Sequence, residues 1–231
     1  MSWNKGYTKY THPGVKKISQ TMKLRSLDNF KIWRDKMKSL GKIKSVYPEL
    51  KKDGDLAELI GVILGDGNIY KFPRTEGLRI ACNSNNKGFV RRYSNLIKKI
   101  FNKKPQNFKV KKVNCITITI YEKFISKRLG IRAGSRKNIK ISIPRWIFKN
   151  KEYTIRYLRG LYEAEGSFCI HKPTSTYKLL FSNRNDYLLD IVYKRMNWLG
   201  FKVNKSGYKV QISRKDDVLR AIDLIRFRKY N

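Results

Sequence analysis

The chain has 231 residues, of which 53 are lysine or arginine and 17 are aspartate or glutamate, so its formal net charge is +36. A surplus of this size repels itself and calls for a polyanion, so nucleic acid is the expected partner. Hydrophobic residues make up 41% of the chain, which is enough to bury a core and excludes a disordered basic tail.

The sequence contains no apolar run long enough to span a membrane and no signal peptide, so we expect no membrane partner. Its three cysteines lie far apart, and an odd number argues against a disulfide framework. No cysteine–histidine cluster has the spacing of zinc ligands. We therefore expect an intracellular protein, in cytoplasm, nucleoid or organelle matrix, that is not secreted.

Residues 1–50 form a basic N-terminal extension with 12 lysines and arginines against 3 acidic residues. Apolar residues recur at roughly helical spacing between residues 15 and 40, which predicts one or two short basic helices after a flexible lead. A basic helix beside DNA adds contacts with phosphates. The extension is therefore a candidate accessory DNA-binding segment.

Residues 51–147 have the pattern of an α+β domain. Apolar residues predict a helix over 55–67 and an amphipathic helix over 87–101, and alternation predicts strands over 77–84 and 113–120. A further helix is predicted over 121–129, ending at a glycine.

The same order returns in residues 148–231. The predicted elements are a helix over 154–166, strands near 167–171 and 177–183, a helix over 186–200, strands near 201–204 and 207–213, and a helix over 215–226. Each half is predicted to have the order αββαββα, so the chain contains an internal repeat. The predicted fold class is α+β, with two pseudo-symmetric halves behind the N-terminal extension.

The first helix of each half ends in a related motif, LIGVILGDG at 59–67 and LRGLYEAEG at 158–166. Small residues stand four apart in both motifs, at Gly61 and Gly65 and at Gly160 and Ala164. Residues four apart share one face of a helix, and small residues there let two backbones come close. Packing of the two faces would bring together the acids near the motif ends, Asp66 and Glu165.

Two carboxylates held together at helix C-termini are electrostatically unfavourable unless cations lie between them. Mg²⁺ takes carboxylate and carbonyl oxygens and water, and a helix end supplies free carbonyls. The sequence therefore predicts a metal site made by Asp66 and Glu165, with Gly65 and Ala164 as carbonyl donors. The expected ion is Mg²⁺, for which Mn²⁺ can substitute.

The two motifs and the order of elements around them, over about residues 55–231, resemble the single-chain LAGLIDADG homing endonucleases of the intron-encoded type. The resemblance implies a saddle of two antiparallel sheets over double-stranded DNA. It implies a metal-dependent double-strand break at a long recognition site, leaving 3′ overhangs. Two motifs in one chain imply a monomer.

The resemblance also implies catalytic residues around the acids. A polar residue closes the second strand of each half, which here is Asn83 in IACNSNN and Asn183 in LFSNRND. The basic residue that follows is Arg184 in the second half, whereas Ser84 stands there in the first half.

A lysine after the third helix is a further catalytic residue that the resemblance implies. In GSRKNIKISIP it corresponds to Lys137, with Arg136 and Lys140 as alternatives.

Strand residues opposite the core are expected to form the DNA-binding face, because such side chains reach base edges in a major groove. The candidates are Tyr70, Arg74, Arg79, Thr117, Thr119, His171, Lys209, Gln211 and Ser213.

Two alternatives share the predicted fold. One is a maturase that binds its own intron RNA, and the other is a DNA-binding regulator without catalysis. Loss of the two acids would be the mark of the regulator, and both acids are present in this chain.

Overall fold

The structure is a computed structural model that describes residues 3–28, 30–136 and 139–230. The chain divides into two compact units, Met1–Pro48 and Glu49–Asn231, which are taken separately below. Among the described helices, none combines the length and the apolar content needed to cross a membrane.

The first unit contains two short helices, α1 (Pro13–Leu24) and α2 (Lys31–Ser39), as the helical spacing predicted. Neither helix has a buried residue. Helix α1 begins after His12, whose Nδ1 accepts a hydrogen bond from the backbone N–H of Gly14 at 3.1 Å. The rings of Trp3 and Tyr7 pack on the imidazole at centroid distances of 5.7 and 4.6 Å. This unit is therefore held mainly by local contacts.

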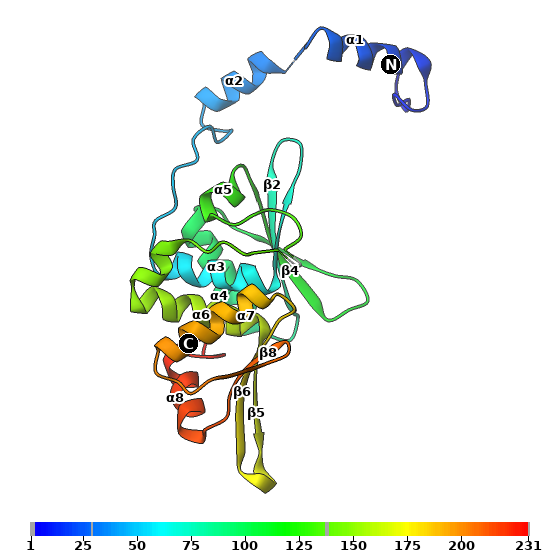
Figure 1. Ribbon diagram of the computed structural model, residues 1–231. Coiled ribbons are helices and arrows are strands. Elements are labelled where there is room, and N and C mark those ends of the chain that lie inside the picture. Colours follow the sequence, from blue (N-terminus) through cyan, green and yellow to red (C-terminus); the bar gives the residue numbers. More distant parts are fainter. Residues whose placement is uncertain (1–2, 29, 137–138, 231) are drawn as a thin grey trace. The chain divides into compact units, whose positions relative to one another are not determined.

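The second unit begins with a half that contains three helices and four strands (Figure 1). Its elements are α3 (Gly54–Asp66), β1 (Gly67–Lys71), β2 (Glu76–Asn83), α4 (Lys87–Phe101), β3 (Gln106–Lys109), β4 (Cys115–Glu122) and α5 (Ile125–Leu129). The helix predicted over 121–129 is too long at its start, because residues 121 and 122 complete β4 and pair with β2. Alternation did not locate β3, whose four residues are all exposed.

The second half repeats this order after a short 3₁₀ helix, η1 (Arg145–Lys149). Its elements are α6 (Lys151–Glu165), β5 (Gly166–His171), η2 (Lys172–Thr174), β6 (Thr176–Ser182), α7 (Asp186–Trp198), β7 (Asn204–Ser206), β8 (Lys209–Ile212) and α8 (Lys215–Ile225). The strand expected near 201–204 begins only at Asn204, because Phe201 turns inward and is buried.

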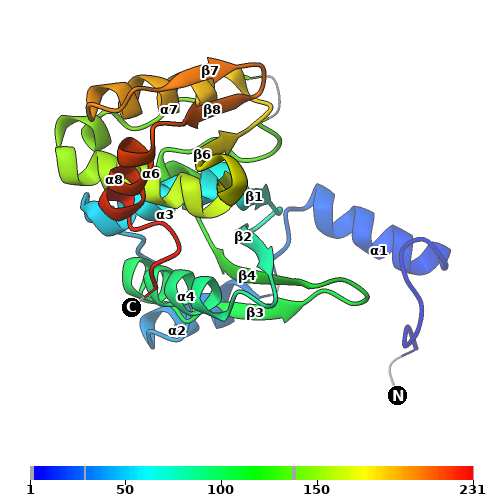
Figure 2. The same ribbon diagram turned by 90° about the horizontal axis from the view of Figure 1, so that it is seen from below.

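Each half forms one antiparallel sheet of four strands, with the equivalent orders β1-β2-β4-β3 and β5-β6-β8-β7. The central pairs match in the two halves, since Ile80 lies opposite Ile118 and Leu179 opposite Ile212, all four buried. Helices α3 and α4 contact the first sheet, and α6, α7 and α8 contact the second (Figures 1 and 2). The core therefore lies between sheets and helices, and the opposite face of each sheet carries the polar side chains.

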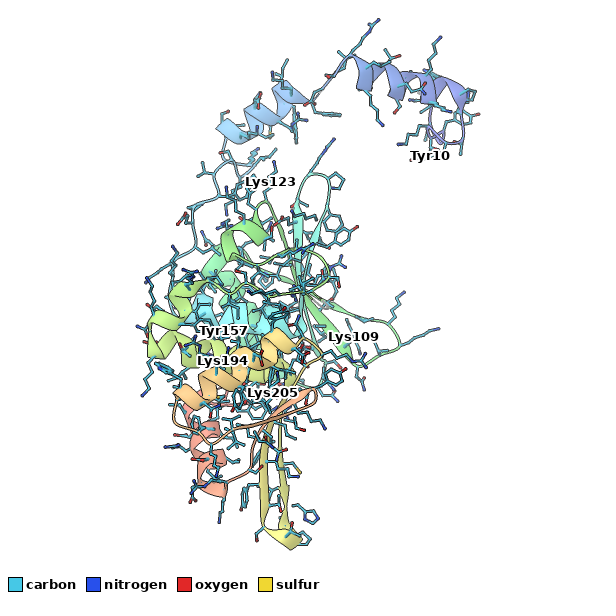
Figure 3. All side chains as sticks on the ribbon, in the orientation of Figure 1. Tyr10, Lys109, Lys123, Tyr157, Lys194 and Lys205 are labelled. Carbon is cyan, nitrogen blue, oxygen red and sulfur yellow. The ribbon has the colours of Figure 1, made fainter. Side chains whose placement is uncertain are left out.

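The contact between α3 and α6 joins the two halves and is closest at two glycines. A Cβ placed on Gly61 would overlap the carbonyl oxygen of Tyr157, and one placed on Gly160 would overlap the carbonyl oxygen of Glu58. Tyr157, labelled in Figure 3, is completely buried among the helices. The small residues that the sequence placed on one helix face are therefore the ones at which the two backbones touch.

A buried carboxylate also stabilises the contact between α3 and α6. Glu58 of α3 has no solvent-exposed surface, and its two oxygens accept hydrogen bonds from Arg92 Nε at 2.6 Å and Nη2 at 2.8 Å. Arg156 of α6 donates its Nε to Glu58 at 2.6 Å. Arg159 lies 3.6 Å away and adds a third positive charge. Burial of this charge is tolerated because its partners surround it, and one of its bonds crosses between the halves.

Residues after α8 form a second connection between the halves. The Tyr230 hydroxyl donates to Glu163 of α6 at 2.6 Å and accepts from Asn86, the N-cap residue of α4, at 3.1 Å. The backbone N–H of Arg228 also donates to Glu163, at 2.6 Å. The end of the chain thus binds α6 to α4.

The glycine contacts give a test of the helix pair. In a helix, Gly→Ala ordinarily stabilises by about 1 kcal/mol. Gly61→Ala should instead destabilise the protein by about 2–3 kcal/mol, because the new methyl group meets backbone atoms that cannot rotate away. Gly65→Ala should be rescued by Ala164→Gly, since a Cβ on Gly65 meets only the side chains of Ala164 and Glu165 at its shortest contacts. Urea unfolding of the three variants measures this, and a neutral Gly61→Ala would contradict the close contact.

Candidate active site

The two acids of the motifs are the last residues of the paired helices. Asp66 ends α3 and Glu165 ends α6, and strands β1 and β5 begin at the next residue of each half. A Cβ on Gly65 would lie 3.2 Å from Cγ of Glu165, so the end of one helix touches the acid of the other. The predicted meeting of the two acids at the base of the helix pair is therefore present.

The electrostatics of the pair are unfavourable for two carboxylates. Crowding by protein atoms raises the pKa of Asp66 to about 7, and the negative charge of Glu165 adds to the effect, even though Asp66 is an exposed residue whose charge solvent partly screens. Burial also raises the pKa of Glu165, and a hydrogen bond from Asn183 opposes this shift. Neutralisation of the two carboxylates is therefore favourable, whether by bound protons or by bound cations.

Asn183 occupies the position expected of a site residue. Its Nδ2 donates to Glu165 Oε1 at 3.1 Å, while its Oδ1 accepts from the backbone N–H of Asn185 at 2.9 Å. The second bond fixes the side chain in a tight turn at the end of β6. Glu165 is thereby oriented by a side chain that is itself held in place.

Asn83 and Asn183, to which the resemblance gives the same role, lie on opposite faces of their sheets. Asn83 is in step with the exposed Arg79, whereas Asn183 is in step with the buried Leu179 and Phe181. The side chain of Asn83 accepts from the N–H of Asn85 at 2.9 Å, as Asn183 accepts from Asn185, but no described hydrogen bond joins it to Asp66. Gly67 pairs with Ile80 and Gly166 with Phe181, so the strand register places Cys82 where the second half has Asn183.

This register makes the halves more different than the sequence predicted. The second half has Asn183 and the exposed Arg184 where the first half has Cys82 and Asn83. The first half therefore has a neutral residue where the second half has an arginine.

Arg136 is the basic residue that the described structure brings to the acids. Its Nη2 donates to the carbonyl oxygens of Ile63, at 2.8 Å, and of Gly67, on either side of Asp66. Burial lowers its pKa, and its Nη1 is buried without a hydrogen-bond partner among the described residues. Lys137, the first choice from sequence, lies outside the described residues, and the alternative Lys140 is exposed.

Asn185 is a site residue that sequence reasoning missed. Its Nδ2 donates to the carbonyl oxygens of Arg136, at 3.0 Å, and Ile139, at 2.9 Å, so it ties the loop before the second half to α7. Its Oδ1 caps α7 by accepting from Leu188 at 3.2 Å. An asparagine directly before a predicted helix indicates a capping role, but no sequence pattern indicates contact with a loop almost fifty residues away.

Side chains on the Glu165 side enclose an open pocket of about 500 Å³. Its polar lining includes Arg136, Asn183, Arg184 and Tyr208 beside Glu165. One carboxylate, two guanidinium groups and an amide around a pocket open to solvent form a suitable environment for a phosphate next to a cation.

The donor set fits a hard divalent cation. Within the described part of the chain, no three His, Cys, Asp or Glu side chains come together, so the protein offers two carboxylates at this place. The carbonyl ends of the helices at Gly65 and Ala164 add oxygen donors, and water or phosphate would complete the shell. Burial, with the nearby Cys115 and Asp66, raises the pKa of Cys82 to about 11, which keeps that thiol protonated and unsuited to a metal.

The outward faces of the two sheets carry most of the predicted DNA-binding residues. The exposed ones are Tyr70, Arg74, Arg79, His171, Lys209 and Ser213, and Thr117 and Gln211 are half-buried. Thr119 differs from its prediction: it pairs with Arg79 on the outward face, yet it is 2% exposed because it lies between the longer side chains of two neighbouring strands. Lys178, exposed opposite Cys169, was missed on the second sheet.

The two-fold repeated arrangement is the LAGLIDADG fold, with two related αββαββα halves that meet at their first helices. Solved structures of that fold align with most of the chain. Mesophilic variants of the homing endonuclease I-DmoI match with 23% identity and a TM-score of 0.52, over 74% of this chain and 94% of theirs. A variant of I-DmoI in complex with its target DNA, in the presence of manganese, matches with 21% identity and a TM-score of 0.53, over 77% and 98%.

The N-terminal LAGLIDADG domain of WhiA is equally similar, with 20% identity and a TM-score of 0.53 over 78% of this chain and 86% of that domain. No family model matches the sequence, and neither does any curated protein. Identities this low establish the fold alone, and one fold serves more than one function.

The raised pKa of Asp66 predicts a pH-dependent effect of Asp66→Asn on stability. A carboxyl group whose pKa is raised on folding stabilises the folded state below its unfolded pKa of about 3.8, and that contribution is lost as pH rises through about 7. In EDTA, Asp66→Asn should therefore raise the melting temperature at pH 8 and have little effect at pH 4.

Asp190→Asn is the matched control, because a hydrogen bond from Lys205 lowers the pKa of Asp190. It should lower the melting temperature slightly at pH 8. The same response to both substitutions would contradict the electrostatic assignment of Asp66.

Proposed function

We propose that the protein is a site-specific DNA endonuclease that requires a divalent cation and cuts both strands of a long target. The observation that carries the proposal is the meeting of Asp66 and Glu165 at the ends of two close-packed helices, beside Arg136, Asn183 and Arg184. The net charge of +36 and the two open sheet faces support DNA as the substrate.

In this proposal Asp66 and Glu165 hold Mg²⁺ or Mn²⁺, with helix-end carbonyls of Gly65 and Ala164 as further donors. Such a cation, when bound, supplies charge neutralisation and Lewis-acid polarisation at a phosphate. I-DmoI has been solved with its target DNA in the presence of manganese or magnesium, which supports this choice of ions.

The chain's own residues then divide the remaining tasks. Asn183 orients Glu165 through its hydrogen bond. Arg136 holds the end of α3 through two carbonyl oxygens, and it is also one of the residues that line the pocket. Arg184, exposed at the pocket, is placed to bind a phosphate oxygen of the DNA. Since the first half has Cys82 and Asn83 at the matching register positions, we expect the two strands to be cut at different rates.

Substitution of the acids tests the proposal. Asp66→Asn and Glu165→Gln keep the side-chain size and remove the negative charge, so each should reduce cleavage by at least about 100-fold while DNA binding survives. The assay follows nicking and linearisation of a supercoiled plasmid that carries the intronless junction of the host gene, in Mg²⁺ and in Mn²⁺.

Asp223→Asn, an exposed acid bonded to Lys229, is the control and should cut normally. Linear product from either acid variant at the wild-type rate would place the metal site elsewhere.

A DNA-binding regulator without catalysis is the second candidate. The equal similarity to the WhiA domain favours it, because the same fold occurs in a protein not named as an endonuclease. Wild-type protein that binds the plasmid junction tightly and leaves both strands intact in both metals would establish this reading. A maturase would bind the intron transcript in preference to the DNA junction.

We further propose that residues 1–48 bind DNA through phosphates. They carry 12 lysines and arginines and 2 acidic residues, and neither helix buries a side chain in its own unit. Deletion of residues 1–48 should weaken DNA binding and reduce the slope of log Kd against log salt, while cleavage at saturating protein is retained. An unchanged salt slope in fluorescence anisotropy would show that the segment neutralises no phosphates.

A further inference from the structure

Three aromatic side chains form a patch on the outward face of the first sheet: Tyr70, Phe72 and Tyr121. The ring of Phe72 lies 4.7 Å from that of Tyr70 and 5.9 Å from that of Tyr121, measured between centroids. Tyr70 is 56% exposed and Tyr121 36%. What distinguishes these three rings is that they lie together in contact on the open face of the sheet.

A glycine beneath the rings makes the patch possible. Gly77 lies between Tyr70 on β1 and Tyr121 on β4 in the strand register, and it is buried. A Cβ there would stand 3.1 Å from ring atoms of both Phe72 and Tyr121. The rings therefore cover the glycine, with their outer surfaces turned away from the core.

Positive charge surrounds this aromatic patch. Arg79 Nη2 donates to the Tyr121 hydroxyl at 3.3 Å, and Arg74 is exposed in the turn that follows Phe72. Tyr70 also forms one wall of an open pocket of about 630 Å³ whose lining includes Lys71, Lys127 and Arg132. A phosphate bound in that pocket would hold a nucleic-acid duplex with its groove against the rings.

Among the described residues, the second sheet has no equivalent cluster of three rings in contact. In the corresponding part of its first hairpin, the outward residues are Cys169 opposite Lys178 and His171 opposite Thr176. Phe168 and Ile170 of β5 are also exposed, but they alternate with these outward residues. The three-ring patch over a glycine is therefore a feature of the first sheet, and it marks a difference between what the two sheets recognise.

The chemistry of a duplex restricts what these rings can contact. The flat faces of paired bases are covered by their neighbours in the stack, so stacking on an aromatic ring needs single-stranded nucleic acid. In the major groove of a duplex, the apolar group on offer is the C5-methyl of thymine, which aromatic and other apolar side chains contact.

We propose that the aromatic patch of Tyr70, Phe72 and Tyr121 recognises thymine methyl groups in the half-site bound by the first sheet. The proposal rests on the proposed DNA-binding function and assigns part of its specificity. The polar outward face of the second sheet reads its half-site by hydrogen bonds instead.

Replacement of thymine by uracil tests this, because it removes the methyl group and leaves base pairing unchanged. The full-length chain in EDTA is used to select duplexes from a random 30-base-pair library, and each thymine of the best duplex is then replaced singly by uracil. One or two adjacent replacements in one half-site should each weaken binding about fourfold, as expected for one buried methyl group.

The coupling to the patch identifies the residues. Phe72→Ser and Tyr121→Ser should each bind the thymine and uracil duplexes with equal affinity. Comparison of the two duplexes on wild-type and variant protein forms a double-mutant cycle for each methyl group. Tyr70→Ser, at the most exposed ring, gives the same comparison should the other two variants unfold. His171→Ala, outward on the second sheet, is the control and should retain the full uracil effect.

The outcomes separate the two proposals. If wild-type protein binds the selected duplex and no uracil replacement weakens it, or if the patch variants keep the full uracil effect, the aromatic patch serves only to cover Gly77 and the inference is overturned. If no duplex is enriched at all, the DNA-binding function itself fails and the inference fails with it.

Discussion

Close approach of two helix backbones is the constraint on which the rest of the structure depends. The two halves meet where Gly61 faces the Tyr157 carbonyl and Gly160 faces the Glu58 carbonyl, with no room for a β-carbon on either side. Because the helices are in contact along this face, their last residues arrive at one place. The meeting of Asp66 and Glu165 is thus a consequence of packing several residues away, and so is the raised pKa of Asp66.

The acids of the helix pair differ in how many hydrogen-bond partners they have. Glu58, in the middle of the helix pair, is surrounded by arginines and accepts hydrogen bonds across both halves. Asp66 and Glu165, at the end of the same pair, receive one amide between them among the described side-chain bonds. The paired Glu58 holds the halves together, whereas neither Asp66 nor Glu165 has an ion pair with any of the described residues. The contrast is the strongest physical argument for a functional site at the helix ends.

Departures from the two-fold repeat gather around the site and the binding faces. The Glu165 side has Asn183 and Arg184, whereas Cys82 and Asn83 stand at the matching register positions of the first half. The first sheet bears three aromatic rings over Gly77, whereas polar residues take the corresponding part of the second. A symmetric scaffold fixes where the two acids and the two sheets lie, and substitutions on its surface make the halves different. In the proposed function, these differences would let each half act on a different strand and a different sequence.

The sequence by itself determined most of the elements and their repetition, because hydrophobic periodicity and two copies of one helix motif are local signals. The fully exposed β3 carries no such signal. It also identified the small residues of the helix interface and the two acids, since spacing along a helix converts directly into a shared face. Only the tertiary structure decided which side chains reach the acids. Asn83 and Asn183 both stand near the end of the second strand of their halves. A shift of one residue turns a side chain to the opposite face of a sheet, so among the described bonds only Asn183 reaches its acid. Arg136 and Asn185 depend on a loop whose path no local pattern encodes, and Thr119 is covered by neighbours that belong to other strands.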